Sequence, residues 1–509
     1  MNGSPVDAII LGSGFGGSLL GLLLAKSRRS VVIVDRGCHP RFAIGESSTP
    51  LADRALADVA REFDADELWP LTRYGLWKKM LPDVTCGLKR GFSYFHQQPG
   101  QDLTEATVRD RQLLVTASAD DHLSDTHWLR SDVDQYVFDC ARSAGVIPFT
   151  DAQYKLRQID SGWQIAVETR DQTFTVCSPF IVDATGQSSE LLKSSGNRGL
   201  ATELQTNTCA VFAHFDNVPK TEDLLAQRGY HVAEHPFHCD DAAVHHVFDT
   251  GWMWQLRFDD GTVSVGLVLN DPAAWMSISA TDIWNAQLRR FPFLQQQFRD
   301  ARIIRPSNQL VKTGRLQRLT ARAAGANWAA LPASAGFVDP LHSTGIAHTV
   351  YAVRRLAGVI RDQRIPSNSW LERYSEQLIT ELKLIDRLTA GCYASLPDFE
   401  LWCAWSMLYF AAATTTERVR DCGDVLGPAF LLADDDEFTQ LLIQAQSRLR
   451  NRPREFTSWL RGAIAPWNSV GLMNPDSRNL YHHTVAPIDI IPDPDDGSIA
   501  NCSTPMTND

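Results

Sequence analysis

The segment Gly12-Ser13-Gly14-Phe15-Gly16-Gly17 lies near the start of the chain and is rich in glycine. The apolar run Ala8-Ile9-Ile10-Leu11 precedes it, and an apolar stretch typical of a helix follows at residues 18–24. A second apolar run, residues 31–34, ends in Asp35. This order of strand, glycine turn, helix, strand and acid is that of a dinucleotide-binding βαβ unit. The sequence therefore predicts that the chain binds FAD or NAD.

Each residue of this unit has a distinct expected task. Gly12 permits the tight turn, Gly14 lets the backbone approach a pyrophosphate, and Gly17 lets the helix pack closely on the strand. The N–H groups that open the helix, beside Phe15, carry a partial positive charge that suits phosphate. Asp35 stands where ribose hydroxyls are bound in such units. We expect all five residues to contact the cofactor.

Length, composition and charge narrow the class of protein. With 509 residues and 44% apolar content, the chain is long enough for two or three domains. A formal charge of -12 argues against nucleic acid as a partner, because neutralising phosphates needs a basic surface. No apolar run reaches the roughly 18 residues of a membrane span. The first strand begins almost at the N-terminus, which leaves no room for a signal peptide.

The cysteines indicate in which compartment the protein is found. The ten cysteines form no CxxC pair and show no zinc-ligand spacing. In a chain of this size they are best interpreted as reduced thiols of a cytoplasmic protein that has no metal site.

We expect a Rossmann-type, doubly wound α/β domain that is interrupted by a β-sheet substrate domain and followed by helices. Short alternating runs such as 251–256 and 262–269 predict the inserted sheet. A helix is expected from residue 345, and residues 368–460 are mostly helical in pattern. The expected segments are a first FAD-binding part (1–215), the sheet segment (216–325), completion of the FAD-binding domain (326–365), the helical region (366–485) and a loose tail (486–509).

Later loops favour FAD over NAD. Asp183-Ala184-Thr185-Gly186 ends an expected strand at 174–183 and would support the adenine side. Asp339 would reach the ribityl chain, and Gly345 opens a helix whose N–H groups could face the flavin. Any one of these loops could be ordinary turn chemistry. Because the sequence has no second GxGxxG unit, we expect reduction by a separate NAD(P)H–flavin reductase or by diffusible nicotinamide.

Four segments together resemble the flavin-dependent halogenases, especially those that act on free phenols. They are the glycine turn, residues 39–50, Cys86-Gly87-Leu88-Lys89-Arg90-Gly91-Phe92-Ser93, and Asp339-Pro340-Leu341-His342-Ser343-Thr344-Gly345. The resemblance runs from residue 5 to about 420. It implies a fold like that of p-hydroxybenzoate hydroxylase, FAD that works as FADH2, and chloride or bromide as co-substrate. We also expect the cofactor to contact Arg36, Ser47 and Arg130.

Lys89 matches the catalytic lysine of that family. The resemblance implies that a flavin hydroperoxide oxidises halide to hypohalous acid, which the lysine then directs onto an electron-rich ring. The alternative is a surface lysine at a strand end, since lysine side chains are mostly exposed. Lys79 is the second candidate.

The loop before the helix at Gly345 would serve halide and substrate. Ser343 and Thr344 would bind the halide; alternatively, one of them only caps the helix. His342 could act as a base toward a phenol, because its ordinary pKa lies near the working pH. Equally, it could be a packed loop residue.

The segment Gly251-Trp252-Met253-Trp254-Gln255-Leu256-Arg257 departs from the family signature Trp-x-Trp-x-Ile-Pro. In the family, the two tryptophans separate the flavin from the substrate; core packing is the alternative. Arg257 in place of proline would add charge near that wall, which leaves direct hydroxylation open.

A helical row of aromatic residues follows further along the chain. Trp402, Trp405, Tyr409 and Phe410 share one helical face, and they either pack in the core or line a substrate site.

The sequence thus predicts an FADH2-dependent halogenase of a phenolic or indolic small molecule, with Lys89 delivering the halogen. One alternative is a monooxygenase of the same fold. The other is a flavoprotein that modifies a partner protein.

Overall fold

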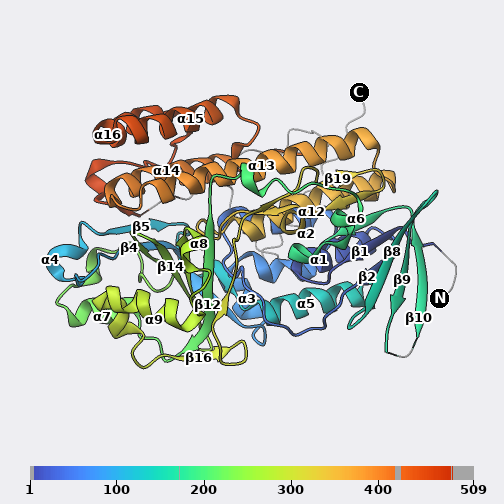
Figure 1. The fold of residues 1–509 in the computed structure, drawn as a ribbon, viewed down its shortest axis with the longest axis horizontal. Coiled ribbons are helices and arrows are strands. Elements are labelled where there is room, and N and C mark those ends of the chain that lie inside the picture. Colours follow the sequence, from blue (N-terminus) through green and yellow to red (C-terminus); the bar gives the residue numbers. More distant parts are fainter. Residues whose placement is uncertain (1–4, 171, 419–425, 483, 485–509) are drawn as a thin grey trace.

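The structure is a computed structural model that describes residues 5–170, 172–418, 426–482 and 484. Figure 1 shows a sheet-and-helix body in which the first glycine turn and its helix lie at one side and a large sheet at the other. The C-terminal helices form a layer along one edge of both parts. The predicted tail, 486–509, lies outside the described residues.

The βαβ unit is the centre of a six-stranded sheet. Its strands run in the order β19 (Ala324–Gly325), β20 (Trp328–Ala330), β11 (Ile181–Asp183), β1 (Ala8–Leu11), β2 (Val31–Val34) and β7 (Ile147–Phe149). All pairs except β19–β20 are parallel. Every residue of β1 and β2 is buried, as expected where helices cover both faces of a parallel sheet. The predicted Rossmann-type fold is confirmed.

Three long helices cover this sheet. The helix α1 (Phe15–Lys26) packs against α5 (Arg130–Ser143) and α12 (Thr344–Gln363). The apolar face predicted for the helix at 345 is buried along its length, at Ile346, Val350, Val353, Leu356, Ala357 and Ile360. The packing of α1 against α12 brings the N-terminal ends of the two helices to the same cavity.

The strand predicted over 174–183 is two strands. The first, β10 (Thr173–Ser178), joins a small antiparallel sheet with β8 (Gln153–Ile159) and β9 (Gly162–Glu168), and the second is β11. Pro179 separates them. Because proline has no N–H to donate to a ladder, the chain changes sheets at this residue.

A nine-stranded sheet forms the other half of the body. Its order is β16 (Arg302–Arg305), β12 (Thr208–Asp216), β15 (Val263–Asn270), β14 (Gly251–Arg257), β13 (Ala243–Phe248), β4 (Gly91–His96), β5 (Gln112–Thr116) and β22 (Leu480–Tyr481), with β17 (Val311–Lys312) paired to β12. Because β4 and β5 come from residues 91–116, the segments 1–215 and 216–325 share this sheet. The proposed segment boundaries remain a prediction.

Two further sheets each consist of two short antiparallel strands. They join β3 (Cys86–Lys89) with β6 (Asp125–Trp128), and β18 (Arg318–Leu319) with β21 (Gly336–Phe337). The first pair is important for the site, because it places Lys89 opposite Asp125.

Two helices follow β2 along the chain. They are α2 (Pro50–Glu62) and the 3-10 helix η1 (Asp66–Thr72). The remaining short helices are α3 (Tyr74–Met80), α4 (Glu105–Val108), α6 (Glu190–Ser194), α7 (Thr221–Gln227), α8 (Pro272–Trp275), α9 (Ala280–Arg290), α10 (Pro292–Gln297) and α11 (Pro332–Ala335).

The predicted C-terminal helical region is present. It contains α13 (Asn368–Ala394), α14 (Phe399–Thr416), α15 (Asp436–Asn451) and α16 (Pro453–Ala463). In Figure 1 these helices lie across the large sheet and the end of the parallel sheet. None of the helices that the structure describes has the length and apolar character that crossing a membrane requires.

Candidate active site

A cavity of about 330 Å³ lies where the glycine turn, the start of α12 and one face of β14 meet. The turn contributes Gly14, Phe15 and Gly16, and the loop after β2 contributes the stretch from Ile44 to Ser47. Most predicted cofactor, halide and barrier residues line it: Gly14, Phe15, Ser47, Arg130, Trp252, Trp254, Asp339, Ser343, Thr344 and Gly345.

The glycine turn is built as the motif requires. Gly12 has φ of 100°, and a Cβ there would lie 2.5 Å from the carbonyl oxygen of Ala184. A Cβ on Gly17 would lie 2.0 Å from the carbonyl oxygen of Gly12. Gly14, by contrast, has only ordinary contacts around its missing Cβ, at 3.7 Å and beyond. Gly12 and Gly17 thus serve the fold, whereas Gly14 leaves open space beside the cavity.

Asp35 lies away from the cavity lining and has its hydrogen-bonding capacity filled. Its carboxylate accepts from Arg41 Nη1 and Nη2 at 2.8 and 2.9 Å, and from the N–H and hydroxyl of Ser13 at 2.6 and 2.8 Å. Burial favours the neutral acid, but these bonds and the Arg41 charge outweigh it and lower the pKa of Asp35 to about 2. A ribose hydroxyl would have to displace one of these donors.

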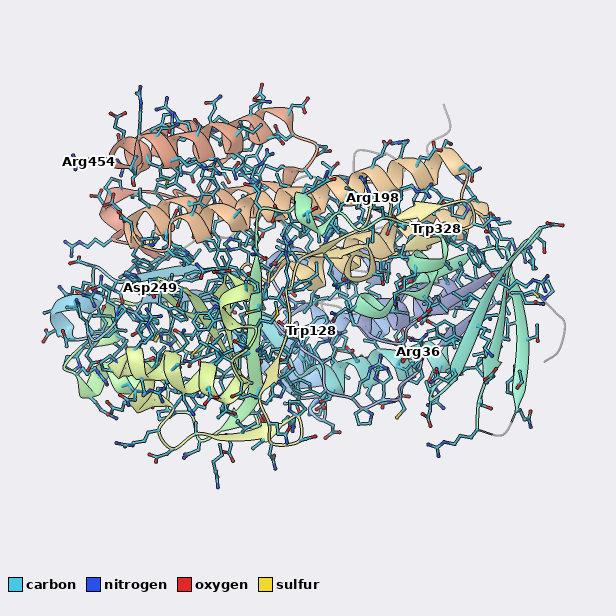
Figure 2. The ribbon with its side chains drawn as sticks, viewed as in Figure 1. Arg36, Trp128, Arg198, Asp249, Trp328 and Arg454 are labelled. Carbon is cyan, nitrogen blue, oxygen red and sulfur yellow. The ribbon has the colours of Figure 1, made fainter. Side chains whose placement is uncertain are left out.

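Two further predicted cofactor residues lie outside the cavity lining. Arg36 pairs with Glu190 at 3.2 Å and covers the ring of Tyr154, near the small sheet (Figure 2). Asp183 is fully buried and accepts from the hydroxyls of Thr185, at 2.7 Å, and Ser189. Its carboxylate therefore holds the turn after β11.

Gly186 and Arg130 belong to the same cofactor prediction. The N–H of Gly186 donates to Ser334 Oγ at 2.9 Å, and Ser334 lines the cavity. Arg130 lines the cavity directly and pairs with Asp134 at 2.7 Å. Its Nη1 also donates to the carbonyl oxygens of Ile44 and Gly45, both at 3.1 Å. Arg130 therefore fixes the loop that carries Ser47.

Asp339 lines the cavity as a buried acid. Its carboxyl accepts from Thr208 Oγ1 at 2.9 Å, Tyr393 OH at 3.0 Å and the N–H of Leu341 at 3.1 Å. Burial dominates over these donors and raises the pKa of Asp339 to about 7. The carboxyl is thus poised to exchange a proton near neutral pH.

The loop before α12, which the sequence predicts to bind halide, contains a residue with positive φ. Ser343 precedes α12 with φ of 53°, and its side chain makes no capping hydrogen bond. The alternative in which Ser343 caps the helix is therefore not what the structure has. Because a left-handed conformation is costly for a residue with a side chain, the surrounding structure must hold Ser343 in it. Ser343, Thr344 and the first N–H groups of α12 face the cavity together.

The two tryptophans form one wall of the cavity. Their rings lie 6.0 Å apart, and each indole N–H has a partner: Trp252 donates to Tyr393 OH at 2.8 Å and Trp254 to Ser264 Oγ at 3.1 Å. Rigid, hydrogen-bonded rings at a cavity suit a barrier. The prediction that Arg257 adds charge near this wall is wrong.

Arg257 lies on the opposite face of β14, since side chains alternate along a strand. It donates to Asp240 Oδ1 at 3.0 Å and to the carbonyl oxygen of Val218 at 2.9 Å. Asp240 also accepts from the N–H groups of Thr221 and Glu222 at 2.9 and 2.8 Å. Arg257 thus anchors the start of α7.

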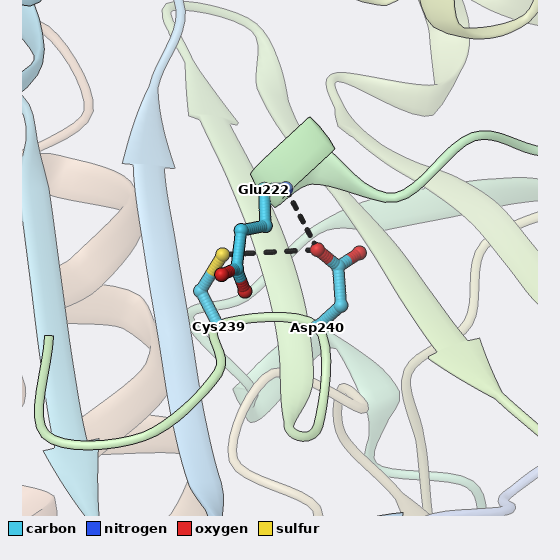
Figure 3. Close-up of side chains that lie close together, drawn as sticks. All are labelled: Glu222, Cys239 and Asp240. Atoms are coloured by element: carbon cyan, nitrogen blue, oxygen red, sulfur yellow. Dashed lines mark hydrogen bonds between the residues drawn. The ribbon is translucent and has the colours of Figure 1, made fainter. Parts of the chain in front are cut away.

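The same acid belongs to a group whose atoms are close enough to hold a metal ion, Glu222, Cys239 and Asp240 (Figure 3). Asp240 already has the donors given above, and the Cys239 thiol points to it at 3.7 Å. Burial raises the pKa of that thiol well above its ordinary value. The group is therefore explained as a structural anchor.

Lys89 is completely buried. It contacts Ser48, the residue that follows the cavity-lining Ser47. Its ammonium donates to the carbonyl oxygen of Ser48 at 2.7 Å and to Asp125 Oδ2 at 3.2 Å. It also lies 4.2 Å from the ring centroid of Phe92. Burial outweighs the Asp125 charge and lowers the pKa of Lys89. The alternative of a surface lysine is excluded, and Lys79 is exposed on α3.

His342 lies among aromatic rings rather than on the cavity surface. It stacks on Tyr409 at 4.2 Å, and its Nε2 lies 3.7 Å from the Cys392 thiol. Its Nδ1 is buried without a hydrogen-bond partner. Burial, with a smaller contribution from His245, lowers the pKa of His342 to about 3. At neutral pH the ring is therefore uncharged.

The aromatic row on α14 divides into two groups. Trp405 packs in the helical core, stacked on Phe456. The other three face β4: Trp402 lies 4.9 Å from Tyr94, and Phe410 lies 5.6 Å and Tyr409 6.5 Å from Phe92. These rings pack around the buried side chains of Lys89 and His342 through Phe92 and Tyr409.

Sequence reasoning missed several residues of the site. Asp53 and Asp125 lie beside Lys89, His245 bridges the aromatic rings to the cavity, and Tyr393 bonds both Trp252 and Asp339. Each comes from a different element, so no local spacing marks them. The Asp125 contact depends on the pairing of β3 with β6, which a single sequence does not display.

Comparison with known proteins places this site in a family. The family described as "Tryptophan halogenase" matches residues 126–406, more than half of the chain. The chain belongs to the tryptophan halogenase family. The predicted membership of the flavin-dependent halogenases is confirmed, and with it the enzyme class, an FAD-dependent oxidoreductase acting on aromatic compounds.

Two halogenases of known activity are similar to this chain over most of its length. The chain is 29% identical over 422 residues to monodechloroaminopyrrolnitrin halogenase PrnC of Pseudomonas fluorescens, covering 79% of this chain and 70% of the relative. It is 28% identical to the tetracycline 7-halogenase of Kitasatospora aureofaciens, covering 78% and 71%.

The fold agrees with solved halogenase structures. The halogenase PltM in complex with phloroglucinol and FAD superposes with a TM-score of 0.81 at 23% identity, covering 94% of this chain and 99% of that chain. The flavin-dependent brominase Bmp2 gives a TM-score of 0.64 at 17% identity, covering 88% and 100%. The cofactor prediction, FAD with a halide co-substrate, agrees with these halogenases.

Proposed function

We propose that this chain is an FADH2-dependent halogenase of a small phenolic or indolic compound, and that Lys89 directs the halogen onto the ring. The proposal rests on one observation above all. Lys89 is enclosed, and its ammonium is bonded to Ser48, whose neighbours Glu46 and Ser47 line the cavity. A reactive amine thus lies just behind the cavity wall.

The cavity fits FAD in its chemistry. Gly14 leaves space for a pyrophosphate, and the N-terminus of α1 offers N–H groups to it. Ser47 presents a buried hydroxyl without a partner, and Asp339 a buried carboxyl. These residues, with Arg130 and the start of α12, would hold the cofactor. When it is bound and reduced, FAD would react with oxygen and halide and so supply the hypohalous acid that the reaction consumes.

The remaining steps belong to the residues of the chain. Ser343, Thr344 and the N–H groups of α12 would hold the halide at the cavity. Trp252 and Trp254 would keep the aromatic substrate from the cofactor. Lys89 would bind hypohalous acid and hold it toward the substrate, whose ring would pack among the aromatic side chains of β4 and α14.

His342 would receive a proton from the substrate. The ring is neutral because its pKa is lowered, and in the tautomer with the proton on Nε2 the Nδ1 without a partner is a hydrogen-bond acceptor. Such a weak base suits the strongly acidic carbon-bound proton of a halogenated ring intermediate rather than the hydroxyl proton of a phenol.

The enclosure of Lys89 also bears on the alternatives. A complete lack of exposure at Lys89 favours a small substrate over a side chain of a partner protein. The separation of Lys89 from the cavity lining favours a mobile oxidant over direct oxygen transfer. A separate NAD(P)H–flavin reductase remains part of the proposal, because the described residues contain one dinucleotide-binding unit.

Product mass spectrometry tests the proposal. The protein, FAD, a flavin reductase with NADH, and bromide or chloride are incubated with small phenols and indoles. We expect a halogen isotope pattern in the mass of the product. The same product is expected when FAD reduced by light is supplied in place of the flavin reductase and NADH. A mass gain of one oxygen would instead assign the chain to the monooxygenases.

A further inference from the structure

We propose that Asp125 accepts the ammonium proton of Lys89 when the amine takes up halogen, and that Asp53 is the positioning residue that holds Asp125 for this task. The inference rests on the proposed function, because hypohalous acid must be supplied. Its evidence is a ring of four residues around the Lys89 side chain.

The ring is closed by hydrogen bonds. Lys89 donates to Asp125 Oδ2 at 3.2 Å and to the carbonyl oxygen of Ser48 at 2.7 Å. The hydroxyl of Ser48 donates to Asp53 Oδ1 at 2.7 Å. A carboxyl–carboxyl hydrogen bond joins Asp53 to Asp125. Three elements meet here: β3 supplies Lys89, β6 supplies Asp125, and the first turn of α2 supplies Asp53.

Charge and burial settle which acid carries a proton. The exposed fractions are 0% for Lys89, 2% for Asp125 and 4% for Asp53. One ammonium cannot neutralise two buried carboxylates, so the pair shares a proton. Burial and the Asp125 charge raise the pKa of Asp53 well above its ordinary value, whereas at Asp125 the Lys89 charge opposes the effect of burial. Asp125 is then the carboxylate that faces Lys89.

No other group near Lys89 is suited to accept the proton. His127 lies on β6 and His245 on β13, and burial lowers the pKa of each to about 3. Tyr409 on α14 is a phenol whose pKa burial raises, so it holds its proton. Among the described residues around Lys89, Asp125 is thus the charged acceptor in direct contact.

The step balances in atoms and charge. The ammonium of Lys89 and hypohalous acid react so that the N–X bond forms and the O–X bond breaks. The nitrogen gives up two protons: one leaves with the hydroxide as water, and the other moves to Asp125. Transfer of X to the aromatic carbon releases the carbon-bound proton to His342. His342 passes this proton to the nitrogen of Lys89, and Asp125 then gives its proton back.

Matched asparagine variants test the assignment. In Asp125→Asn the amide keeps the shape but removes the acceptor, so aromatic halogenation at pH 7 should fall at least tenfold. The loss should shrink at pH 9, because burial lowers the pKa of Lys89, so that the amine more often needs no acceptor for its proton. Asp53→Asn can still donate to Asp125, so its loss should stay below about threefold. Asp58→Asn, on the outer part of the same helix, is the control.

A second readout separates this inference from the proposed function. Free hypohalous acid is trapped with monochlorodimedone, and its yield should be equal in wild type, Asp125→Asn and Asp53→Asn. If wild type yields no hypohalous acid, the proposed function fails and this inference with it. Equal, pH-independent losses in both variants, or none in Asp125→Asn, would overturn the inference alone. Should Asp125→Asn not fold, a tenfold loss in a folded Asp53→Asn would still overturn it.

Discussion

The indole N–H of Trp252 donates to the hydroxyl of Tyr393 at 2.8 Å, and that hydroxyl donates to Asp339 at 3.0 Å. The wall of the cavity is thereby tied to α13 through a residue that the sequence did not mark. The same hydroxyl links the wall to an acid whose pKa lies near 7.

Tyr393→Phe should loosen this wall. It leaves the Trp252 N–H and one side of Asp339 without a partner, which costs about 1–3 kcal/mol in a buried site. The free energy of urea unfolding should fall by that amount, and FAD should bind more weakly. Tyr154→Phe, outside the cavity, serves as the control; equal FAD affinity in Tyr393→Phe and wild type would contradict the expectation.

Two glycine variants should behave in opposite ways. Gly14→Ala adds a Cβ that meets only ordinary contacts, so the apoprotein should keep its unfolding temperature while FAD affinity falls at least tenfold. Gly17→Ala drives a Cβ into the backbone of Gly12, at 2.0 Å, so the fold itself should suffer. Calorimetry and flavin fluorescence titration measure both effects. Unchanged FAD binding in Gly14→Ala would argue against a pyrophosphate at this turn.

Arg257→Gln tests whether the departure from the family signature alters the chemistry. Loss of the Asp240 pair should reduce stability by about 2 kcal/mol. Because Arg257 lies on the face of β14 away from the tryptophans, the ratio of halogenated to hydroxylated product should not change. A rise in hydroxylated product in this variant would show that the residue does act on the wall.

Stability should decline in mild acid because several histidines are buried and neutral. Burial lowers the pKa of His127, His245, His246 and His342 to about 3, and of His96 and His235 to about 4. Below pH 6.5 these histidines become protonated in the unfolded chain but stay neutral in the native state. Each such histidine then costs up to about 1.4 kcal/mol per pH unit, down to its native pKa.

Buried acids oppose this trend. Asp53, Asp125 and Asp339 have raised native pKa values, so they contribute stability as the pH falls toward 4. Because the histidines are more numerous, the net free energy of unfolding should drop between pH 7.5 and 5. Urea titrations at the two pH values measure it. His246→Gln should flatten the slope by about one proton, with exposed His122→Gln as control.

The local part of this architecture was predictable from sequence. The glycine turn with its two strands and the helix from residue 344 are set by neighbouring residues, and the cavity forms at these elements. The alternation of β14 was also legible: period two places Arg257 opposite to Trp252 and Trp254. The prediction that Arg257 adds charge near the tryptophans was wrong because it considered only the position of Arg257 in the sequence and not the face of the strand.

The environment of Lys89 was not predictable in the same way. Its burial depends on the register of β3 with β6, which brings Asp125 beside it from 36 residues away. Likewise Asp35 fits the motif, yet Arg41 folds back and fills its carboxylate. Such pairings arise from tertiary contacts, which no motif or spacing in one sequence encodes.

The most direct test of the account is halogenation by Lys89→Ala beside wild type, with exposed Lys79→Ala as the matched control. All three proteins should bind FAD and release equal hypohalous acid to monochlorodimedone. The account predicts that mass spectrometry finds halogenated aromatic product from wild type and Lys79→Ala, and at least a hundredfold less from Lys89→Ala. Undiminished product from a folded, FAD-loaded Lys89→Ala would contradict it.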